Sequence, residues 1–343
     1  MGIAASLLLS VVVLAFLWPS KTSEAHNLPV SVAGPEASVS ALETALGEGG
    51  TFDFIAAVDR DDAVSQIESR ETYGAIVLGS VTDAPEVLTA PAGSPVAAQL
   101  LNGVATRLQA QFAQQVAAAG GDASSVSVAV TPVVPLSADD PTGTGLAAAS
   151  FPLAIGGMIG GVLISLLVVG PVRRLLAVAG FAVAAGLVLA FILQPWFGYI
   201  EGDFLINAVA MGLTMLATSA FIIGCTSLIG RAGIGIGAVV TIFVGNPLAA
   251  TAAPWQFLLE PWGAIGQHLV PGASGALIRT LSYFPNADPS RQWWTLIAWA
   301  AGGILLTLIG HFRSRPSMTV PESTIDTGMD TDTDTDTDTR VTV

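Results

Sequence analysis

The densest cluster of charged side chains in this sequence is formed by Asp59, Arg60, Asp61 and Asp62. Carboxylates at this spacing could hold a divalent cation, because hard metals prefer oxygen ligands. No histidine or cysteine lies nearby, however, and the cluster falls at the predicted start of a helix, where negative charge is favourable. We therefore interpret it as a helix start, and the sequence predicts no metal site and no cofactor.

Catalytic motifs are absent from the sequence. It contains no nucleophile elbow, no Walker lysine and no HExxH pair. The only cysteine, Cys225, excludes an intrachain disulfide and a cysteine-based metal site. The chain is therefore predicted not to be an enzyme, and if ATP drives it, a separate subunit must bind the nucleotide.

An acidic side chain stands out in a long apolar segment near the C-terminus. Glu260 could act in gating or contact a substrate, and a carboxylate that simply reaches the membrane surface is the alternative. Arg279 is close enough in sequence to pair with it. Trp255 and Trp262 flank Glu260 and fit an aromatic belt at a membrane surface. These four residues are the candidate gate or substrate contact.

Membrane-crossing helices must position these residues. A helix needs roughly 20 apolar residues to cross about 30 Å of hydrocarbon. Of all residues 52% are hydrophobic and 11% are charged, against about 25% charged in a soluble domain. Apolar blocks occupy residues 2–17, 151–170, 175–193, 204–229, 232–252 and 293–309. We predict an α-helical polytopic membrane protein with six spans and an inserted extracytoplasmic α/β domain.

Arginines set the predicted orientation, because short cytoplasmic loops carry the excess of Lys and Arg. Arg173 and Arg174 follow the second block, Arg231 precedes the fifth, and more basic residues follow the last. These three arginines fall on one side of the membrane and are candidate cytoplasmic contacts. The sequence thus predicts a multi-pass protein of the cell membrane with a cytoplasmic C-terminus and residues 19–149 outside.

The predicted domains follow from this topology. Residues 1–18 form a signal anchor, which we favour over a cleaved signal peptide although Ser23 and Ala25 offer a cleavage pattern. Because no basic residue precedes the anchor, we hypothesise a start upstream of Met1. Residues 150–311 form a five-helix transmembrane domain with an apolar outer loop at 246–292. Residues 312–343, which include an Asp-Thr repeat, are predicted to be a disordered acidic tail.

Residues 19–149 show the alternation of a small α/β domain. Ser94 is the predicted N-cap and Pro95 the first residue of its longest helix. Residues 139–145 are predicted to be a polar linker into the membrane. Strands are predicted at 28–34, 52–58, 73–78, 86–90 and 125–136, and helices at 36–46, 61–70 and 95–119.

Charge excludes several functions. Between Lys21 and Ala149, fifteen acidic residues face four basic ones, so the sequence does not support nucleic-acid binding. The five later apolar blocks contain no Asp, Glu or His, which an ion-coupled carrier usually places within a span. Ion-coupled transport is therefore disfavoured.

Glycines at four-residue spacing mark helix-packing faces. Such pairs let a second helix approach to backbone distance. The partner could be a helix of the same bundle or of a second copy in a homodimer, and the sequence leaves both open. The candidate packing residues are Gly156, Gly157, Gly160, Gly161, Gly233 and Gly237.

The order of these parts resembles the ABC-2 type transporter permease family, especially its YhgE/Pip-like actinobacterial branch. The resemblance covers most of residues 1–312 and rests on three segments: LPVSVAG after the anchor, FPLAIGGMIGG at 151–161, and residues 246–284. It implies a membrane subunit of an exporter, surrounded by lipid and working as a homodimer with a separate ATPase subunit. The apolar outer loop favours an amphipathic substrate, which the sequence does not identify.

One departure from the family supports an alternative. Permeases that engage an ATPase present a cytoplasmic helix before the first span and a coupling helix between the second and third. This chain begins at the first span and has little more than residues 171–174 in the second position. The alternative is a non-transporting envelope protein whose exported domain binds a partner, a cell-wall component or a phage.

Overall fold

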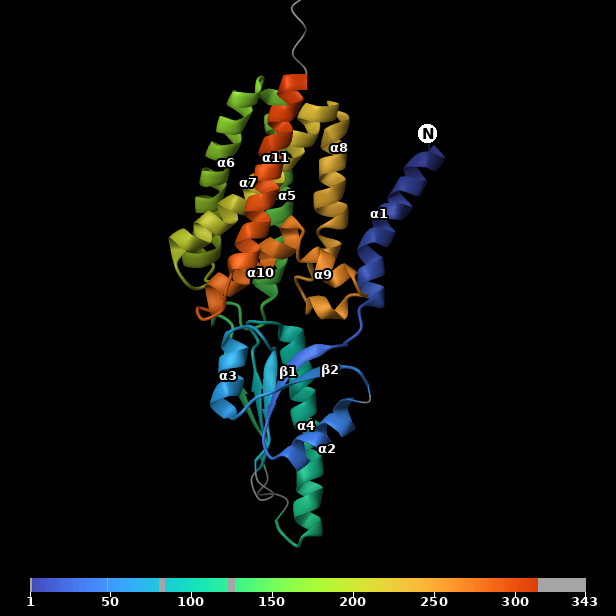
Figure 1. Cartoon of the computed structure of the whole chain (residues 1–343), viewed down its shortest axis with the longest axis vertical. Coiled ribbons are helices and arrows are strands. Elements are labelled where there is room, and N and C mark those ends of the chain that lie inside the picture. The colour runs from blue at the N-terminus through green and yellow to red at the C-terminus, as the bar shows by residue number, and fades with distance from the viewer. Residues whose placement is uncertain (1, 48, 80–83, 123–126, 314–343) are drawn as a thin grey trace, which may run out of the picture.

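Among the residues that the structure describes, four helices are long and apolar enough to cross a membrane. The computed structural model describes residues 2–47, 49–79, 84–122 and 127–313. Within them it is mostly helical, with a helical bundle at one end and a small sheet at the other (Figure 1). This mostly helical fold with a small mixed sheet is compatible with the predicted membrane protein. The four helices are α5 (Thr144–Leu167), α6 (Pro171–Phe191, continued by η2, Ile192–Trp196), α7 (Phe204–Ile229) and α11 (Ser290–Arg313).

Two further apolar helices in the described residues are shorter. α1 (Gly2–Thr22) includes the short apolar segment Leu9–Pro19, and its contact with the bundle includes Phe16 against Phe243, with ring centroids 6.1 Å apart. α8 (Ala232–Ala238) continues as the π-helical η3 (Val239–Val244) and ends there, not at residue 252 as predicted. Pro247 lies just beyond this end and cannot continue the hydrogen-bond ladder. Four of the six predicted spans therefore have full spanning length.

α7 forms the centre of the bundle, with most of its length buried. Glycines allow its neighbours to approach closely. A Cβ on Gly186 of α6 would lie 2.4 Å from the carbonyl oxygen of Ala208, and one on Gly224 would lie 2.6 Å from that of Gly303 in α11. Helices that meet at such small residues gain close van der Waals packing, which drives helix association in lipid.

The α/β domain contains a five-stranded sheet of order β2-β1-β3-β4-β5, in which β3 and β4 pair antiparallel and the other neighbours pair parallel. Helices α2 and α4 pack on one face and α3 on the other. All five predicted strands and three predicted helices are found. Their bounds are β1 (Leu28–Ala33), α2 (Glu36–Gly47), β2 (Phe52–Ala56), α3 (Arg60–Glu68), β3 (Gly74–Val77), β4 (Glu86–Thr89), α4 (Pro95–Ala118) and β5 (Ala129–Pro132).

Capping explains where the helices of this domain begin. The Ser94 hydroxyl accepts a bond of 3.2 Å from the Ala97 amide, and Pro95 opens α4, as predicted. Asp59 caps α3 by accepting from the Asp62 amide at 2.9 Å. The acidic cluster is therefore a helix start, and no group of metal-ligating side chains occurs in the described residues.

The predicted outer loop folds as a series of short helices next to the α/β domain (Figure 1). The longest, α10, packs against α7 and α11 through the buried Ala273 and Leu277, which share one hydrophobic cluster with Ala217 and Leu296. The loop thus enters the bundle at this end. Its elements are η4 (Pro247–Ala249), η5 (Trp255–Phe257), α9 (Trp262–Gly266) and α10 (Val270–Tyr283).

A continuous hydrophobic core joins the two parts of the chain. One cluster of buried residues includes Ile67 and Leu88 of the domain, Phe284 after α10, and Met211 and Met215 of α7. The predicted polar linker at 139–145 is also part of this joint, since α5 already begins at Thr144. We define the region where the α/β domain meets α10 and residues 246–257 as the junction.

Candidate functional site

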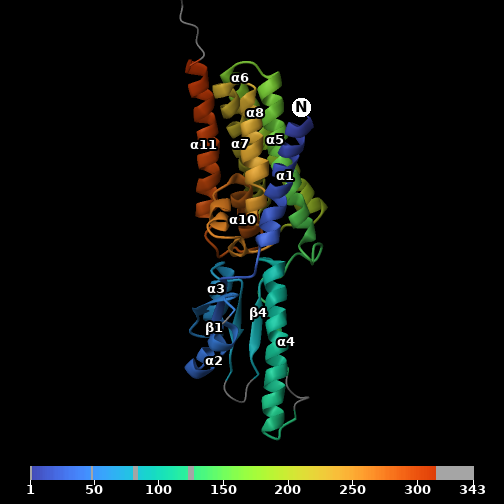
Figure 2. The same cartoon turned by 90° about the vertical axis from the view of Figure 1, so that its right-hand side faces the viewer.

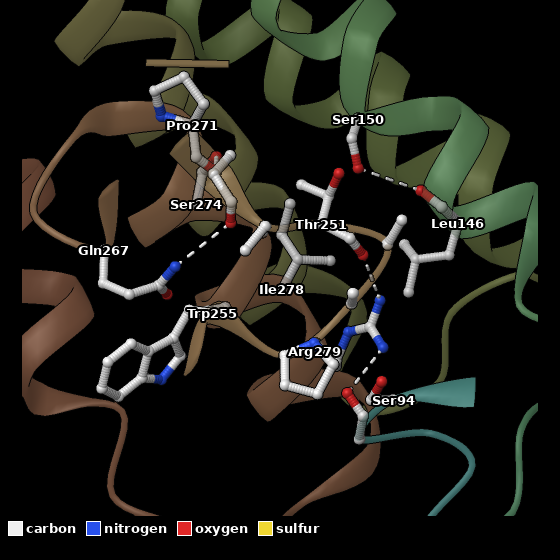
Figure 3. Close-up of a pocket in the computed structure, with 18 of the residues that line it drawn as sticks. Ser94, Leu146, Ser150, Thr251, Trp255, Gln267, Pro271, Ser274, Ile278 and Arg279 are labelled. Atoms are coloured by element: carbon white, nitrogen blue, oxygen red, sulfur yellow. Dashed lines mark hydrogen bonds between the residues drawn. The ribbon is translucent and has the colours of Figure 1, made fainter. Parts of the chain in front are cut away.

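A cavity lies inside the junction and opens between α4, α5 and α10. Its volume is about 70 Å³, and it is lined from both parts of the chain by Arg70, Ser94, Leu146 and Arg279 among others. Figure 3 shows Arg279 between Thr251 and Ser94, with Leu146 and Ser150 of α5 on one side and Gln267 and Trp255 on the other. We call this space the junction cavity.

Arg279 of α10 reaches from the bundle into the α/β domain. Its Nη1 donates to the carbonyl oxygens of Ala92 at 3.0 Å and Gly93 at 2.9 Å, and its Nη2 donates to that of Thr251 at 3.3 Å. These acceptors lie just before α4 and between η4 and η5. Arg279 therefore fixes α10 to both neighbouring segments through main-chain oxygens.

Arg70 reaches in the opposite direction, from the α/β domain to α10. Its Nη1 donates to the Ala276 carbonyl oxygen at 3.0 Å and to the Thr280 hydroxyl. The Arg70 guanidinium carbon also lies 5.1 Å from the centroid of the Phe284 ring, within the range of a cation–π interaction. The two arginines thus cross the junction as a reciprocal pair.

The backbone of Arg70 takes an unfavourable conformation. Its φ is +62°, in the left-handed region where a residue with a Cβ is strained by roughly 1–2 kcal/mol. It follows the C-cap of α3, a position where glycine is the usual residue. The strain is retained because this conformation ends α3 and directs the guanidinium to α10.

The electrostatics of the junction are dominated by positive charge. Burial, opposed by nearby Tyr73 and assisted by the charges of Arg279 and Arg291, lowers the pKa of Arg70 to about 10. Burial also lowers the pKa of Arg279. No Asp or Glu lines the cavity, and neither arginine forms an ion pair with a described residue. Both guanidinium groups stay protonated at neutral pH without a carboxylate partner there.

Hydrogen bonds hold the apolar side of the cavity in place. The buried Asp140 carboxylate accepts from the amides of Gly145 at 3.0 Å and Leu146 at 2.9 Å, at the start of α5. The Tyr283 hydroxyl donates to the Tyr199 carbonyl oxygen at 2.6 Å, which ties the end of α10 to the segment before α7. The cavity walls therefore belong to well-anchored elements.

The predicted gate residues are separated by the structure. Arg279 and Trp255 line the junction cavity, whereas Glu260 is exposed, lines a second cavity near Asp53, and forms no ion pair with a described residue. The suggested pairing of Glu260 with Arg279 is not formed among the described residues, because the two side chains line different cavities. Trp262 is exposed on α9 and borders an apolar groove with Trp18.

The candidate glycines pack within the chain. A Cβ on Gly157 would lie 2.8 Å from Thr218, and one on Gly161 would lie 3.0 Å from Ser219, both on α7. The Ser219 hydroxyl also donates to the Gly157 carbonyl oxygen at 2.7 Å.

The remaining candidate glycines also face helices of the same chain. Gly156 and Gly160 face Met215 of α7 and Phe181 of α6, and Gly233 and Gly237 face Cys225 and Ile222 of α7. These glycine faces are thus occupied by the bundle itself.

The candidate cytoplasmic arginines lie in the first turn of α6 and in the link between α7 and α8, at the end of the bundle far from the sheet (Figure 1). Arg173 and Arg231 are exposed. Arg174 is instead used locally, since its Nε donates to the Val168 carbonyl oxygen at 2.8 Å and its Nη2 to that of Ser165 at 2.9 Å. It therefore caps the C-terminus of α5.

Sequence reasoning missed Arg70, Tyr73 and Thr251, because they lie far from Arg279 along the chain and meet it only after folding. One signal for Arg70 is available in the sequence. No glycine follows the predicted helix at 61–70, so another residue must adopt the left-handed conformation that commonly ends a helix. The predicted acidic tail at 314–343 lies outside the described residues. Comparison with known proteins finds no matching family model, no matching curated protein and no matching solved structure.

Proposed function

We propose that this chain is the membrane-spanning, permease-like subunit of an ABC-2 type exporter, which moves an amphipathic substrate out of the cell with a separate ATPase. In this proposal α1 and the α8–η3 helix complete six spans in the plasma membrane. Residues 19–149 lie outside, the C-terminus lies in the cytoplasm, and two copies form the working unit.

The observation that carries the proposal is the junction cavity. It is polar where Arg279 and Ser94 line it and apolar where Leu146, Leu153 and Ile278 line it. An amphipathic molecule leaving the bundle would meet both kinds of wall at the outer surface of the membrane. Arginines in the links at the opposite end agree with a cytoplasmic side there.

The alternative, a non-transporting envelope protein, has its own supporting observation. The links at the far end are short, since only residues 168–170 join α5 to α6, and residues 230 and 231 join α7 to α8. Arg174 is also occupied in capping α5. Within the described residues this end offers a small surface to an ATPase.

Co-purification of ATP hydrolysis distinguishes the two functions. The full chain is cross-linked in membranes of its source cell, purified in mild detergent, and assayed for ATPase activity. The exposed Arg173 and Arg231 are changed together to Glu, and Arg107→Glu on α4 is the matched control. We expect the double variant to lose about tenfold of the co-purified activity, since disrupting a charged contact costs about 1.4 kcal/mol or more.

The control should retain the activity, because Arg107 lies on the α/β domain. Absence of ATPase activity from the wild-type preparation contradicts the exporter and favours the envelope protein. Equal activity in the double variant and the control contradicts a contact through these arginines.

A further inference from the structure

We propose that the junction cavity is a binding site for a phosphate group, held by Arg70 and Arg279, with the head group of an anionic lipid and free phosphate as its two sources. This proposal concerns binding alone and stands whether or not the chain transports a substrate. It rests on unused donors, uncompensated charge, fixed geometry and the size of the cavity.

Both guanidinium groups have donors to spare. A guanidinium carries five N–H donors. Arg279 uses three of them on described residues and Arg70 uses two, all on uncharged acceptors. The Nε of each residue, the Nη2 of Arg70 and one N–H of the Arg279 Nη2 are thus left for a ligand. Phosphate oxygens match the planar fork of these donors.

The positive charge at the junction also favours binding of an anion. Two partly buried cations line one cavity that has no carboxylate in its described wall, and Arg291 adds a third positive charge beside Arg70. The acidic groups nearby are engaged or peripheral. Asp140 accepts main-chain amides of α5 and offsets the charge of Arg279 only in part, without an ion pair, and Glu71 and Asp288 are exposed at an adjoining cavity. A bound phosphate would relieve the repulsion between the guanidinium groups.

The donors are held in place before any ligand arrives. Main-chain carbonyl oxygens fix Arg279, and the Thr280 hydroxyl and the Phe284 ring fix Arg70. A site fixed in this way loses little side-chain entropy on binding. The left-handed backbone of Arg70 is consistent with a functional position, where strain is often retained.

The size of the cavity limits the ligand. A volume of about 70 Å³ corresponds to little more than two water molecules in the liquid, so one compact group fills it. Leu146, Leu153 and Ile278 continue its wall toward the bundle, and the tryptophan-rich loop sets it near the level of lipid head groups. The phosphate enters the cavity, and the remainder of a lipid lies along the bundle.

Calorimetric titration of the purified full chain tests this site. The protein is kept in a maltoside detergent, which contains no phosphate, and ATPase is absent from the assay. Three probes are titrated: inorganic phosphate, short-chain phosphatidylglycerol, and short-chain diacylglycerol, which has the same tails without phosphate. We expect saturable binding of one or both phosphate probes and none of diacylglycerol.

Variants locate the binding. We expect Arg279→Gln to weaken binding at least about tenfold, as the loss of one charge-assisted contact implies. Arg107→Gln removes an exposed arginine elsewhere in the α/β domain and should bind as the wild type does. Because Arg279→Gln also loosens the junction, Ser150→Leu is a second variant, which fills the cavity and keeps both arginines. It loses one local bond, from Ser150 to the Leu146 carbonyl oxygen, and should also block binding.

Each outcome decides the proposal. Phosphatidylglycerol binding that inorganic phosphate does not compete identifies a lipid head group, and binding of inorganic phosphate identifies a soluble oxyanion. Absence of both overturns the site. Equal affinity in Arg107→Gln, Arg279→Gln and Ser150→Leu overturns it as well, because binding would then lie elsewhere. Failure of this experiment leaves the proposed exporter untouched, since no transport step is measured.

Discussion

Arg70 and Arg279 reach across the junction in opposite directions, and each ends on groups of the other part of the chain. At the scale of single residues, these hydrogen bonds across the junction mean that both arginines stabilise the docking of the α/β domain on α10 even without a ligand. Their unused donors and missing carboxylate partners give them a second role. An arginine that served only to join two segments would gain more from a nearby Asp or Glu, which the cavity lacks.

Tyr73 offers a pH-dependent test at this scale. Burial raises the pKa of its phenol, the charges of Arg70 and Arg279 partly oppose this, and its hydroxyl lies 3.3 Å from Gln256 Oε1. Because the folded-state pKa is raised, Tyr73 contributes stability below its unfolded pKa of about 10, and this is lost as pH rises through the folded value. We expect Arg70→Gln to raise the Tyr73 pKa further, since it removes a charge that favours the phenolate.

Phenolate absorbance during alkaline titration measures this shift. Tyr73→Phe identifies the Tyr73 component among the three tyrosines of the chain, and Arg107→Gln serves as the control. A titration curve unchanged by Arg70→Gln would show that the guanidinium does not act on Tyr73.

At the scale of elements, α5, α10 and residues 246–255 supply most of the side chains and backbone that line the site. α5 is set against α7 by glycines, and α10 is wedged between α7 and the α/β domain. Against α7 both helices pack through small side chains and close main-chain approach, whereas Arg70 and Arg279 join α10 to the α/β domain. This is the packing expected where lipid, and not water, surrounds a bundle.

Gly161→Leu tests the packing of α5. Its Cβ would lie 3.0 Å from the Ser219 Cα and 3.0 Å from the Ile222 Cβ, so the added atoms must push α5 away from α7. We expect a loss of about 1–3 kcal/mol, as in other overpacked cores. Gly180→Leu on α6 is the matched control, because no atom lies within 4 Å of its Cβ position.

Thermal unfolding in detergent compares the two glycine variants. Similar melting of Gly161→Leu and Gly180→Leu would contradict the close contact of α5 with α7. Loss of stability only at concentrations where copies associate would instead place Gly161 in an interface between chains.

At the scale of the whole molecule, the sheet and the basic links occupy opposite ends of the bundle (Figure 1). α11 runs between these ends, from the junction to the described C-terminus. If the bundle crosses a membrane, the α/β domain and the α7–α8 link therefore lie on opposite sides of it.

Cysteine labelling checks this arrangement. Cys225, the only native cysteine, is buried and is first replaced by Ala. Arg107→Cys and Arg231→Cys then place exposed thiols on α4 and at the start of α8. An impermeant maleimide should label the first in intact cells and the second only after lysis. Labelling of both in intact cells would contradict the topology.

The fold was largely predictable from the sequence where local signals are strong. The apolar block at 204–229 coincides with α7, whose start is capped by Asp203 and whose end is set by Gly230, with φ of +68°. α4 was predicted from Ser94 and Pro95. By contrast, the block at 232–252 did not reveal that the helix ends at Val244, since apolar composition continues past Pro247.

The junction cavity could not be predicted in the same way. Its wall combines residues near 70, 93, 146, 251 and 279, which are brought together by the docking of two independently patterned segments. Periodicity identifies each helix and strand, but it does not determine how the sheet sits on α10. Arg279 was noticed only as a charge in an apolar segment, and its partners are main-chain oxygens, which carry no sequence signal.

The attachment of α4 beside the cavity has a mechanical consequence. Its first residues lie at the junction, whereas its other end points away from the bundle (Figure 2). With 24 residues, α4 is about 36 Å long. A tilt of about 10° at its base would displace its tip by about 6 Å for a rod of that length. Small movements of α10 against α7 and α11 would thus be magnified into a displacement that a molecule outside the membrane could sense.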